Sequence, residues 1–237
     1  MTPHTDPPRA DPAVVDDESA AVPAVPAVDA VVSGEPAAVP LIALRKRPRP
    51  GERRVQILRT LAAMLEEPGA ERITTAALAA RLGVSEAALY RHFASKAQMF
   101  EGLIEFVEQT VFGLVNQIAE RETDATLQVE KMLTVLLQFG EKNPGMARVM
   151  VGDALVFENE RLLARMNQFF DRIESMLRQS LRQGAAETGS ATPTVDAAGR
   201  ASALSAFAIG RLQRFARSGF KRSPTEHLDV ALRLLCR

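Results

Sequence analysis

The chain has 237 residues, of which 46% are hydrophobic and 24% are charged, and its basic residues balance its acidic ones. This length supports one or two packed cores, while a neutral balance by itself indicates no partner. The single cysteine, Cys236, excludes an internal disulfide, and the Cys/His clusters of a zinc site, an apolar run of membrane-spanning length and a signal peptide are absent. We therefore expect a cytoplasmic protein without metal or cofactor.

The N-terminal part differs in composition from the rest. Most of the prolines lie within residues 1–50, and the run AAVPAVPAVDAVVSGEPAAVP has neither a helical nor a strand period. Because proline lacks an amide donor and restricts the residue before it, we predict a disordered, partly extended tail over residues 1–44. This tail is acidic, whereas the segment RKRPRPGERR that follows is basic. The basic segment is either a phosphate footprint or a solvated linker.

The first helical pattern begins at Glu52. Its apolar residues recur at spacings of three and four, which places them on one stripe of a helix: Val55, Leu58, Leu61, Ala62 and Leu65. Pro68 and Gly69 follow and predict the end of this helix.

Two short helices joined at a glycine come next, which is typical of a helix-turn-helix motif. The second helix is predicted to begin at a Thr74 cap and to end at Gly83, because glycine reaches the left-handed conformation at little cost. Ser85 is predicted to cap the third helix. Leu89 and Phe93 lie four residues apart and are expected to share its buried face.

A long helix is predicted after this motif. Ser95, with Gln98 three residues later, forms a capping-box pattern. Lys96 would lie in the first turn, where a cation is unfavourable for the helix dipole, and a nearby phosphate would explain its position. The helix continues through apolar residues at helical spacing: Met99, Phe100, Leu103, Ile104, Phe106, Val107, Val111, Leu114, Val115 and Ile118.

The remaining chain is predicted to be helical as well. The pattern indicates helices from Leu127 to Gly140, from Pro144 onward, and from Leu162 to about Gln183. The segment GAAETGSATPT predicts a loop. The last helical region contains the small residues Ala201, Ser205, Ala208 and Gly210, which permit close helix approach.

The segment ITTAALAARLGVSEAALYRHFASKAQMFEGLI resembles the DNA-binding head of TetR-type transcription factors. Over nearly all of residues 53–183 the chain is similar to the nucleoid occlusion branch of that superfamily. The segments that carry this second resemblance are LIEFVE, FGEKNPGMARVM, ALVFENERL and QFFDRIE.

The resemblance implies an all-α, TetR-type fold. It implies a three-helix head over residues 51–111, with its helix-turn-helix at 74–93, and a helical body over residues 112–237. The tail with its basic end, over residues 1–50, is expected from the composition alone. A homodimer would form through residues 196–220 and 224–236 and bind pseudo-palindromic double-stranded DNA. The body would disrupt polymers of the division protein FtsZ over the nucleoid, without a small-molecule ligand or a membrane span.

The resemblance also implies the site residues. Contacts to DNA are expected from Thr74, Thr75, Ser85, Glu86, Ala87, Ala88, Tyr90, Arg91, His92 and Lys96. Ser85 to Ala88 would reach base edges, and Tyr90 onward would contact phosphates. Thr74 and Ser85, like Ser95, are also expected to be helix caps. Contacts to FtsZ are expected from Phe106, Lys142 and Asn143. Alternatively, Phe106 is a core residue, and Lys142 and Asn143 only end a helix beside the proline.

Two other classes of function compete with this interpretation. A ligand-responsive TetR-type repressor would need a sizeable, mostly apolar pocket in the body. An enzyme is not expected, because His4, His92 and His227 form no plausible triad and the chain has no P-loop or dinucleotide fingerprint.

Overall fold

The structure is a computed structural model that describes residues 51–67, 72–187 and 189–236. The predicted tail and the predicted helix stop at Pro68 and Gly69 lie outside these residues. The described residues contain helices and no strand, which confirms the all-α class. In chain order the helices are α1 (Glu52–Leu65), α2 (Thr75–Leu82), α3 (Glu86–Tyr90), α4 (Lys96–Arg121), α5 (Ala125–Lys142), α6 (Pro144–Met150), the 3₁₀ helix η1 (Asp153–Leu155), α7 (Glu160–Glu187), α8 (Pro193–Arg217) and α9 (Leu228–Leu235).

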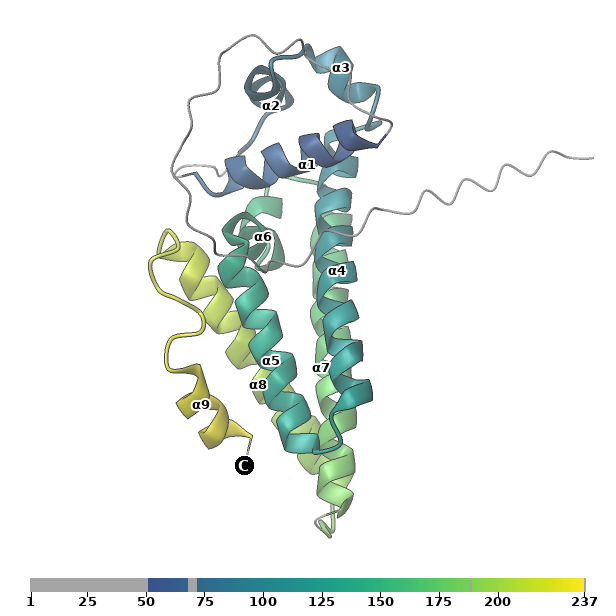
Figure 1. Cartoon of the computed structure of the whole chain (residues 1–237), viewed down its shortest axis with the longest axis vertical. Helices are drawn as coiled ribbons and strands as arrows, with labels where there is room; N and C mark the ends of the chain where they lie inside the picture. Colours follow the sequence, from purple (N-terminus) through teal and green to yellow (C-terminus); the bar gives the residue numbers. More distant parts are fainter. Residues whose placement is uncertain (1–50, 68–71, 188, 237) are drawn as a thin grey trace, which may run out of the picture. The chain divides into compact units, whose positions relative to one another are not determined.

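Helices α1 to α3 form the head, at the N-terminal end of α4 (Figure 1). α1 packs against α2, α4 and α6, and α2 packs against α3. The predicted buried face of α3 is confirmed, because Leu89 and Phe93 are each 1% exposed. Burial of these apolar side chains among several helices is the main force that holds the short α3 in place.

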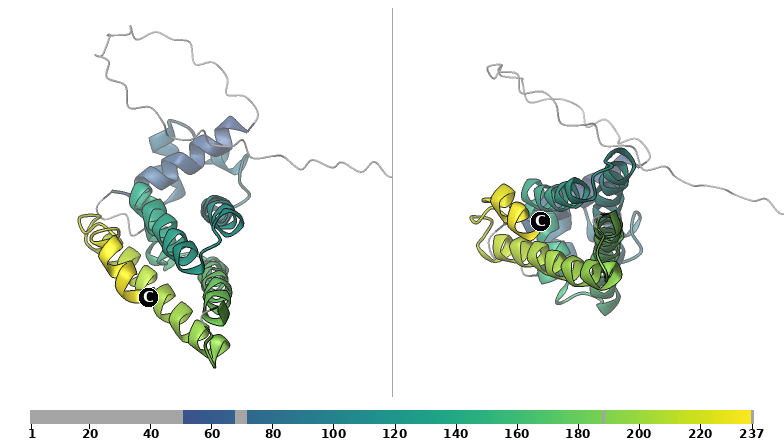
Figure 2. Two further views of the ribbon diagram at one scale, coloured as in Figure 1. Left: turned by 60° about the horizontal axis from the view of Figure 1, so that its bottom comes forward. Right: turned by 90° about the horizontal axis from the view of Figure 1, so that it is seen from below.

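α4 begins in the head and continues into the body, which also contains α5 to α9. The long helices α4 and α7 lie side by side, α7 packs along α8, and α5 contacts α4, α7 and α8 (Figures 1 and 2). Their buried positions recur at helical spacing and join one apolar core with the head. In the described part of the chain, no helix is both long and apolar enough for a bilayer crossing.

Two predicted apolar stripes differ from the structure. In α1 the buried positions include Ile57 and Met64, which the predicted stripe omitted, because α1 has neighbours on several sides. Leu114 is 40% exposed despite its helical spacing. The neighbours of α4 instead cover the side that holds Phe112 and Val115.

Two predicted helix ends were also wrong. α7 continues past Gly184, where a Cβ atom would lie 2.8 Å from the Cβ atom of Ala125, so this glycine serves close packing rather than a loop. α9 begins only at Leu228. The hydroxyls of Ser223 and Thr225 donate to the carboxylate of Glu141, which holds the preceding residues in turns.

Candidate nucleic-acid interface

Three hydroxyl caps begin α2, α3 and α4, and one glycine ends α2, as predicted. The hydroxyl oxygen of Thr74 accepts from the amide of Ala77 at 3.1 Å, and that of Ser85 accepts from the amide of Ala88 at 3.3 Å. Gly83 ends α2 in the left-handed region, with φ 65° and ψ 40°. Because each side chain satisfies an otherwise free amide, both helices begin at defined residues.

The third cap begins α4. The hydroxyl oxygen of Ser95 accepts from the amide of Gln98 at 3.1 Å, and the side chain of Gln98 accepts from the amide of Ala94 at 2.6 Å. This is the predicted reciprocal pattern, with its second bond displaced to the residue before the cap. It fixes where the turn after α3 ends and where the link to the body starts.

Capping does not use up the hydrogen-bonding capacity of these hydroxyls. A hydroxyl that accepts from an amide retains its own hydrogen as a donor. Thr74 and Ser85 are both exposed. Their side chains are therefore able to cap a helix and to donate to a phosphate at the same time.

The predicted contact residues of α3 form a surface with exposed and half-buried members. Glu86, Ala87, Tyr90 and Arg91 are exposed, while Ala88 and His92 are half-buried. Tyr90 in particular is 45% exposed although it is a large aromatic residue. An exposed polar and aromatic face on a helix whose other face is buried is the geometry that a recognition helix needs.

One residue of this face has a partner within the head. The hydroxyl of Thr75 donates to Oε2 of Glu86 at 2.6 Å, which joins the first residue of α2 to the first residue of α3. The bond restricts the carboxylate of Glu86 and leaves Oε1 as an acceptor. Two of the predicted DNA-contact residues thus act on each other in the free protein.

Lys96 has a partner within the protein that the sequence did not predict. Its ammonium forms an ion pair with Oε1 of Glu158, which lies between η1 and α7, and it lies 5.6 Å from the centre of the Phe100 ring. The carboxylate therefore supplies an anion beside the helix start, where the sequence alone suggested a phosphate. Glu158 lies 62 residues away in sequence, and no local pattern indicates this pairing.

Arg54 has a role that the sequence analysis missed. Its guanidinium donates to the backbone carbonyl of His92 at 2.8 Å and lies 4.2 Å from the centre of the Phe93 ring. Arg54 thereby fastens α1 to the turn between α3 and α4. Arg54 is part of the basic segment 45–54, but its guanidinium makes contacts within the head.

Two of the three residues expected to contact FtsZ, Phe106 and Asn143, contact Phe139. The ring of Phe106 on α4 is half-buried, with its centre 6.0 Å from that of Phe139 on α5. The side-chain amide of Asn143 donates to the carbonyl of Phe139 at 2.8 Å, and Lys142 is the exposed last residue of α5. The structure brings these side chains to one end of the α4–α5 pair and gives Phe106 and Asn143 structural contacts as well.

The all-helical architecture and the helix-turn-helix corner define a TetR-type DNA-binding protein, which is not an enzyme class. Residues 57–103 match the family described as bacterial regulatory proteins, tetR family. Residues 123–237 match the SlmA-like family described as tetracyclin repressor-like, C-terminal domain.

The chain belongs to the SlmA family of nucleoid occlusion factors, which confirms the resemblance found in its sequence. It is 52% identical over 189 residues to nucleoid occlusion factor SlmA of Aliivibrio fischeri, an alignment that covers 79% of this chain and 96% of the relative. It is 52% identical over 178 residues to the factor of that name from Idiomarina loihiensis, covering 75% of this chain and 90% of the relative.

Solved structures show the same fold. The TetR family regulator PfmR of Thermus thermophilus has a TM-score of 0.63 at 22% identity, over 77% of this chain and 94% of that one. The regulator FadR of Bacillus subtilis, solved in complex with stearoyl-CoA, has a TM-score of 0.61 at 15% identity, over 77% of this chain and 97% of that one. At these identities the similarity concerns the fold alone.

Proposed function

We propose that this protein is a DNA-bound inhibitor of cell division that acts in the cytoplasm on the nucleoid. A homodimer binds specific pseudo-palindromic chromosomal sites through the head, residues 51–111. The body, residues 112–237, disrupts FtsZ polymers, so that the division ring does not form over the nucleoid. The observation that carries the proposal is the 52% identity to a nucleoid occlusion factor, which extends over 96% of that relative and so includes its body.

Base edges are contacted by the start of α3 in this proposal. The free Oε1 of Glu86 can accept from a cytosine amino group, and the methyl groups of Ala87 and Ala88 suit the methyl group of thymine. Thr75 holds the carboxylate in one orientation while it accepts. Direct readout therefore comes from a short, locally fixed set of side chains.

Phosphates are contacted in this proposal by the hydroxyls of the caps, by the end of α3 from Tyr90 to His92, and by Lys96 at the start of α4. Arg91 is exposed and has no ion pair among the described residues, so its charge is available to DNA. Replacing Arg91 by Gln should reduce the slope of log K against log salt by about 0.9 for each head. Arg178→Gln on α7 is the matched control, because Arg178 is also exposed and without an ion pair among the described residues but belongs to the body. An unchanged slope for the Arg91 variant would argue against phosphate contact.

Dimerisation through α8 and α9 is supported by apolar side chains left uncovered in the single chain. Leu234 on α9 is 78% exposed and Val230 is 44% exposed, while a Cβ atom at Gly210 on α8 would meet nothing within 4 Å. Figure 2 shows α9 close to α8. Two heads held by such an interface can bind half-sites one helical turn apart, about 34 Å.

The dimer interface is tested by sedimentation velocity. Leu234→Glu should shift the protein from dimer to monomer at micromolar concentration, because it places two charges in an apolar contact. Leu127→Glu on α5 is the control, since Leu127 is also exposed, at 44%, but lies on a different helix. A monomeric wild-type protein would refute the interface.

The FtsZ surface is proposed to lie at the end of the α4–α5 pair that holds Phe106, Lys142 and Asn143. An exposed cation on α5 and a half-buried aromatic ring on α4 suit a partner segment with both acidic and apolar side chains. Leu114, exposed on α4, adds apolar surface to the same helix. We propose that Lys142 contributes to binding directly and that Phe106 and Asn143 also maintain the surface.

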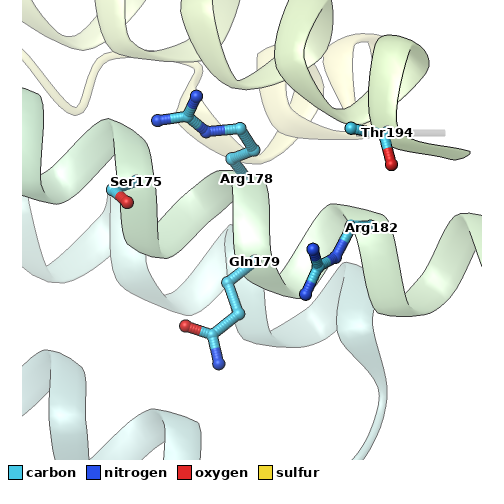
Figure 3. Close-up of a pocket in the computed structure, with 5 residues that line it drawn as sticks. All are labelled: Ser175, Arg178, Gln179, Arg182 and Thr194. Carbon is cyan, nitrogen blue, oxygen red and sulfur yellow. The ribbon is translucent and has the colours of Figure 1, made fainter.

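A ligand-responsive repressor has less support from the structure. One surface hollow, of about 240 Å³, is lined by Ser175, Arg178, Gln179, Arg182 and Thr194. Four of these residues come from α7 and one from α8, and their side chains point in different directions rather than toward one centre (Figure 3). A second hollow, at the end of α8, is lined by polar and charged residues too. Neither has the mostly apolar lining typical of a small-molecule site.

The proposal is tested by co-sedimentation of FtsZ polymers with this protein, with and without a DNA duplex that it binds. We expect the amount of pelleted FtsZ to fall, and to fall further with DNA. Lys142→Ala should weaken this effect and leave DNA affinity unchanged, while Lys131→Ala on the same helix should change neither. No effect of the wild-type protein in either condition would refute the FtsZ activity and return the ligand-responsive repressor to consideration.

A further inference from the structure

We infer that Glu158, a residue of the body, sets the affinity of the head for DNA by competing with a DNA phosphate for the ammonium of Lys96. The inference rests on the proposed phosphate contacts of the head. It assigns to Glu158 an effect on DNA binding without any contact to DNA, because its carboxylate acts through the lysine.

The pair joins the first residue of α4 to the segment before α7. The side chain of Lys96 is 25% exposed, whereas that of Glu158 is only 9% exposed. Solvent therefore reaches the ammonium more readily than the carboxylate. Among the described residues, the ammonium contacts the carboxylate of Glu158 and the ring of Phe100, whose centre is 5.6 Å away, and a phosphate would compete with the carboxylate.

Glu158 is held in place from both sides. Its backbone amide donates to the carbonyl of Leu155 at 3.0 Å, which closes a turn after η1. Beyond it, Arg161 pairs with Glu101 at 2.6 Å, and Arg165 forms a two-bond contact with Glu108. These contacts fasten the start of α7 to α4, so the carboxylate cannot follow an ammonium that moves away.

Lys96 is the partner that moves. A lysine carries its charge on a flexible stem of four carbons, and the ammonium can reorient without changing the backbone of α4. Its cap at Ser95 keeps that backbone fixed. When the ammonium turns to a phosphate, the largely shielded carboxylate of Glu158 loses the one cation paired with it among the described residues.

The loss of this pair opposes DNA binding. Leaving a partly buried carboxylate without its cation costs free energy, and that cost reduces the affinity for DNA. Linkage requires the reverse effect to be equal, so bound DNA weakens the contact between α4 and the start of α7. DNA binding to the head is thereby coupled to the body through the ion pair between Lys96 and Glu158.

The test is a double-mutant cycle on DNA affinity, measured over about 0.05 to 0.2 M salt. Glu158→Gln should tighten binding about fivefold for each head and leave the salt slope unchanged, because the phosphate contact is the same but the competitor is gone. Lys96→Gln should reduce the slope by about 0.9 for each head. In the Lys96→Gln background, Glu158→Gln should have no effect.

Two further variants separate the pair from general charge and from folding. Glu101→Gln removes a carboxylate from the same α4–α7 interface without touching Lys96, and it should leave DNA affinity unchanged. Glu158→Asp keeps the charge but shortens the side chain, and it should tighten binding by less than Glu158→Gln. If thermal melting shows that Glu158→Gln does not fold, the aspartate variant carries the test.

The outcomes are distinguishable. Equal tightening by Glu158→Gln with and without Lys96, or no tightening at all, would overturn the inference. If Arg91→Gln lowers the salt slope but Lys96→Gln does not, the inference fails while the proposed phosphate contacts stand. If neither variant changes the slope, the phosphate contacts of the proposed function fail as well.

Discussion

The head and the body of this protein are fixed by contacts of different reach along the chain. In the head, three side-chain hydroxyls accept from amides three residues later and set the starts of α2, α3 and α4. In the body, side chains bridge segments far apart in sequence: Gln128 with Ser180, 52 residues apart, and Glu141 with Thr225, 84 residues apart.

Because of this difference, the effects of a substitution extend less far in the head than at the bridging residues of the body. A substitution on the exposed face of α3 alters the proposed reading surface and leaves the caps that position it. A substitution at one of these bridging residues of the body affects two segments at once, because the side chain joins them. Substitutions in each region can distinguish the two kinds of contact, and the largest effect is expected where head and body meet.

The largest effect is expected at Gly145 in α6. A Cβ atom there would lie 2.2 Å from the backbone carbonyl oxygen of Ala62 in α1. Gly145→Ala must therefore push a head helix away from a body helix, because the backbone of a packed helix cannot yield as a side chain can. We expect the free energy of unfolding, measured in urea, to fall by about 3 kcal/mol.

Gly113 in α4 is the control for this prediction. A Cβ atom there meets nothing within 4 Å. Gly113→Ala should raise the free energy of unfolding by about 0.5–1 kcal/mol, because alanine has a higher helix propensity than glycine. Similar small effects at both glycines would show that α1 and α6 separate freely.

The next effect concerns two helix caps of the same kind, one in each region. Ser85 caps α3 in the head, and Asp124 caps α5 in the body by accepting from the amides of Thr126 and Leu127 at 2.8 and 2.9 Å. Replacing either cap by Ala should cost about 1 kcal/mol of stability in urea unfolding. Only Ser85→Ala should also weaken DNA binding in a fluorescence anisotropy titration. Equal loss of DNA affinity in both variants would remove the distinction between the regions.

A smaller effect is expected at Thr75. Thr75→Val keeps the shape of the side chain but removes the hydroxyl that donates to Glu86. The free energy of unfolding should change by less than about 1 kcal/mol, because the bond is at the surface. The preference for the specific DNA site over a variant site should fall, as measured by competition binding. An unchanged preference would show that Thr75 does not position Glu86 for readout.

The smallest effect at neutral pH concerns Cys236 in the body. Burial raises the pKa of its thiol from 9.0 to about 11. Between these values the unfolded thiol loses its proton before the folded one, so its contribution to stability is complete below pH 9 and is lost as the pH approaches 11. Alkylation of the native thiol should accelerate with a midpoint near pH 11. A midpoint at pH 9 or below would contradict the burial of Cys236.

The parts of the fold that the sequence predicted well depend on neighbours in the chain. The caps at Thr74, Ser85 and Ser95 and the left-handed Gly83 follow from residue types within a few positions. The start of α6 at Pro144 is of the same kind.

The features that were missed depend on distant partners. The exposure of Leu114, the packing role of Gly184 and the late start of α9 each require knowledge of which helix lies alongside. The pairing of Lys96 with Glu158 is a further example. The contacts to DNA and FtsZ stay predictions, since they involve molecules outside the chain.

The contact made by Arg54 bears on how this head can diverge among relatives. Its guanidinium bonds to the backbone carbonyl of His92, not to the imidazole. Every amino acid offers that carbonyl, so position 92 can accept new side chains while α1 stays attached to the turn before α4. The side chain at position 92 can therefore change during evolution, and with it the contacts of the end of α3, while the bond from Arg54 to the backbone is kept.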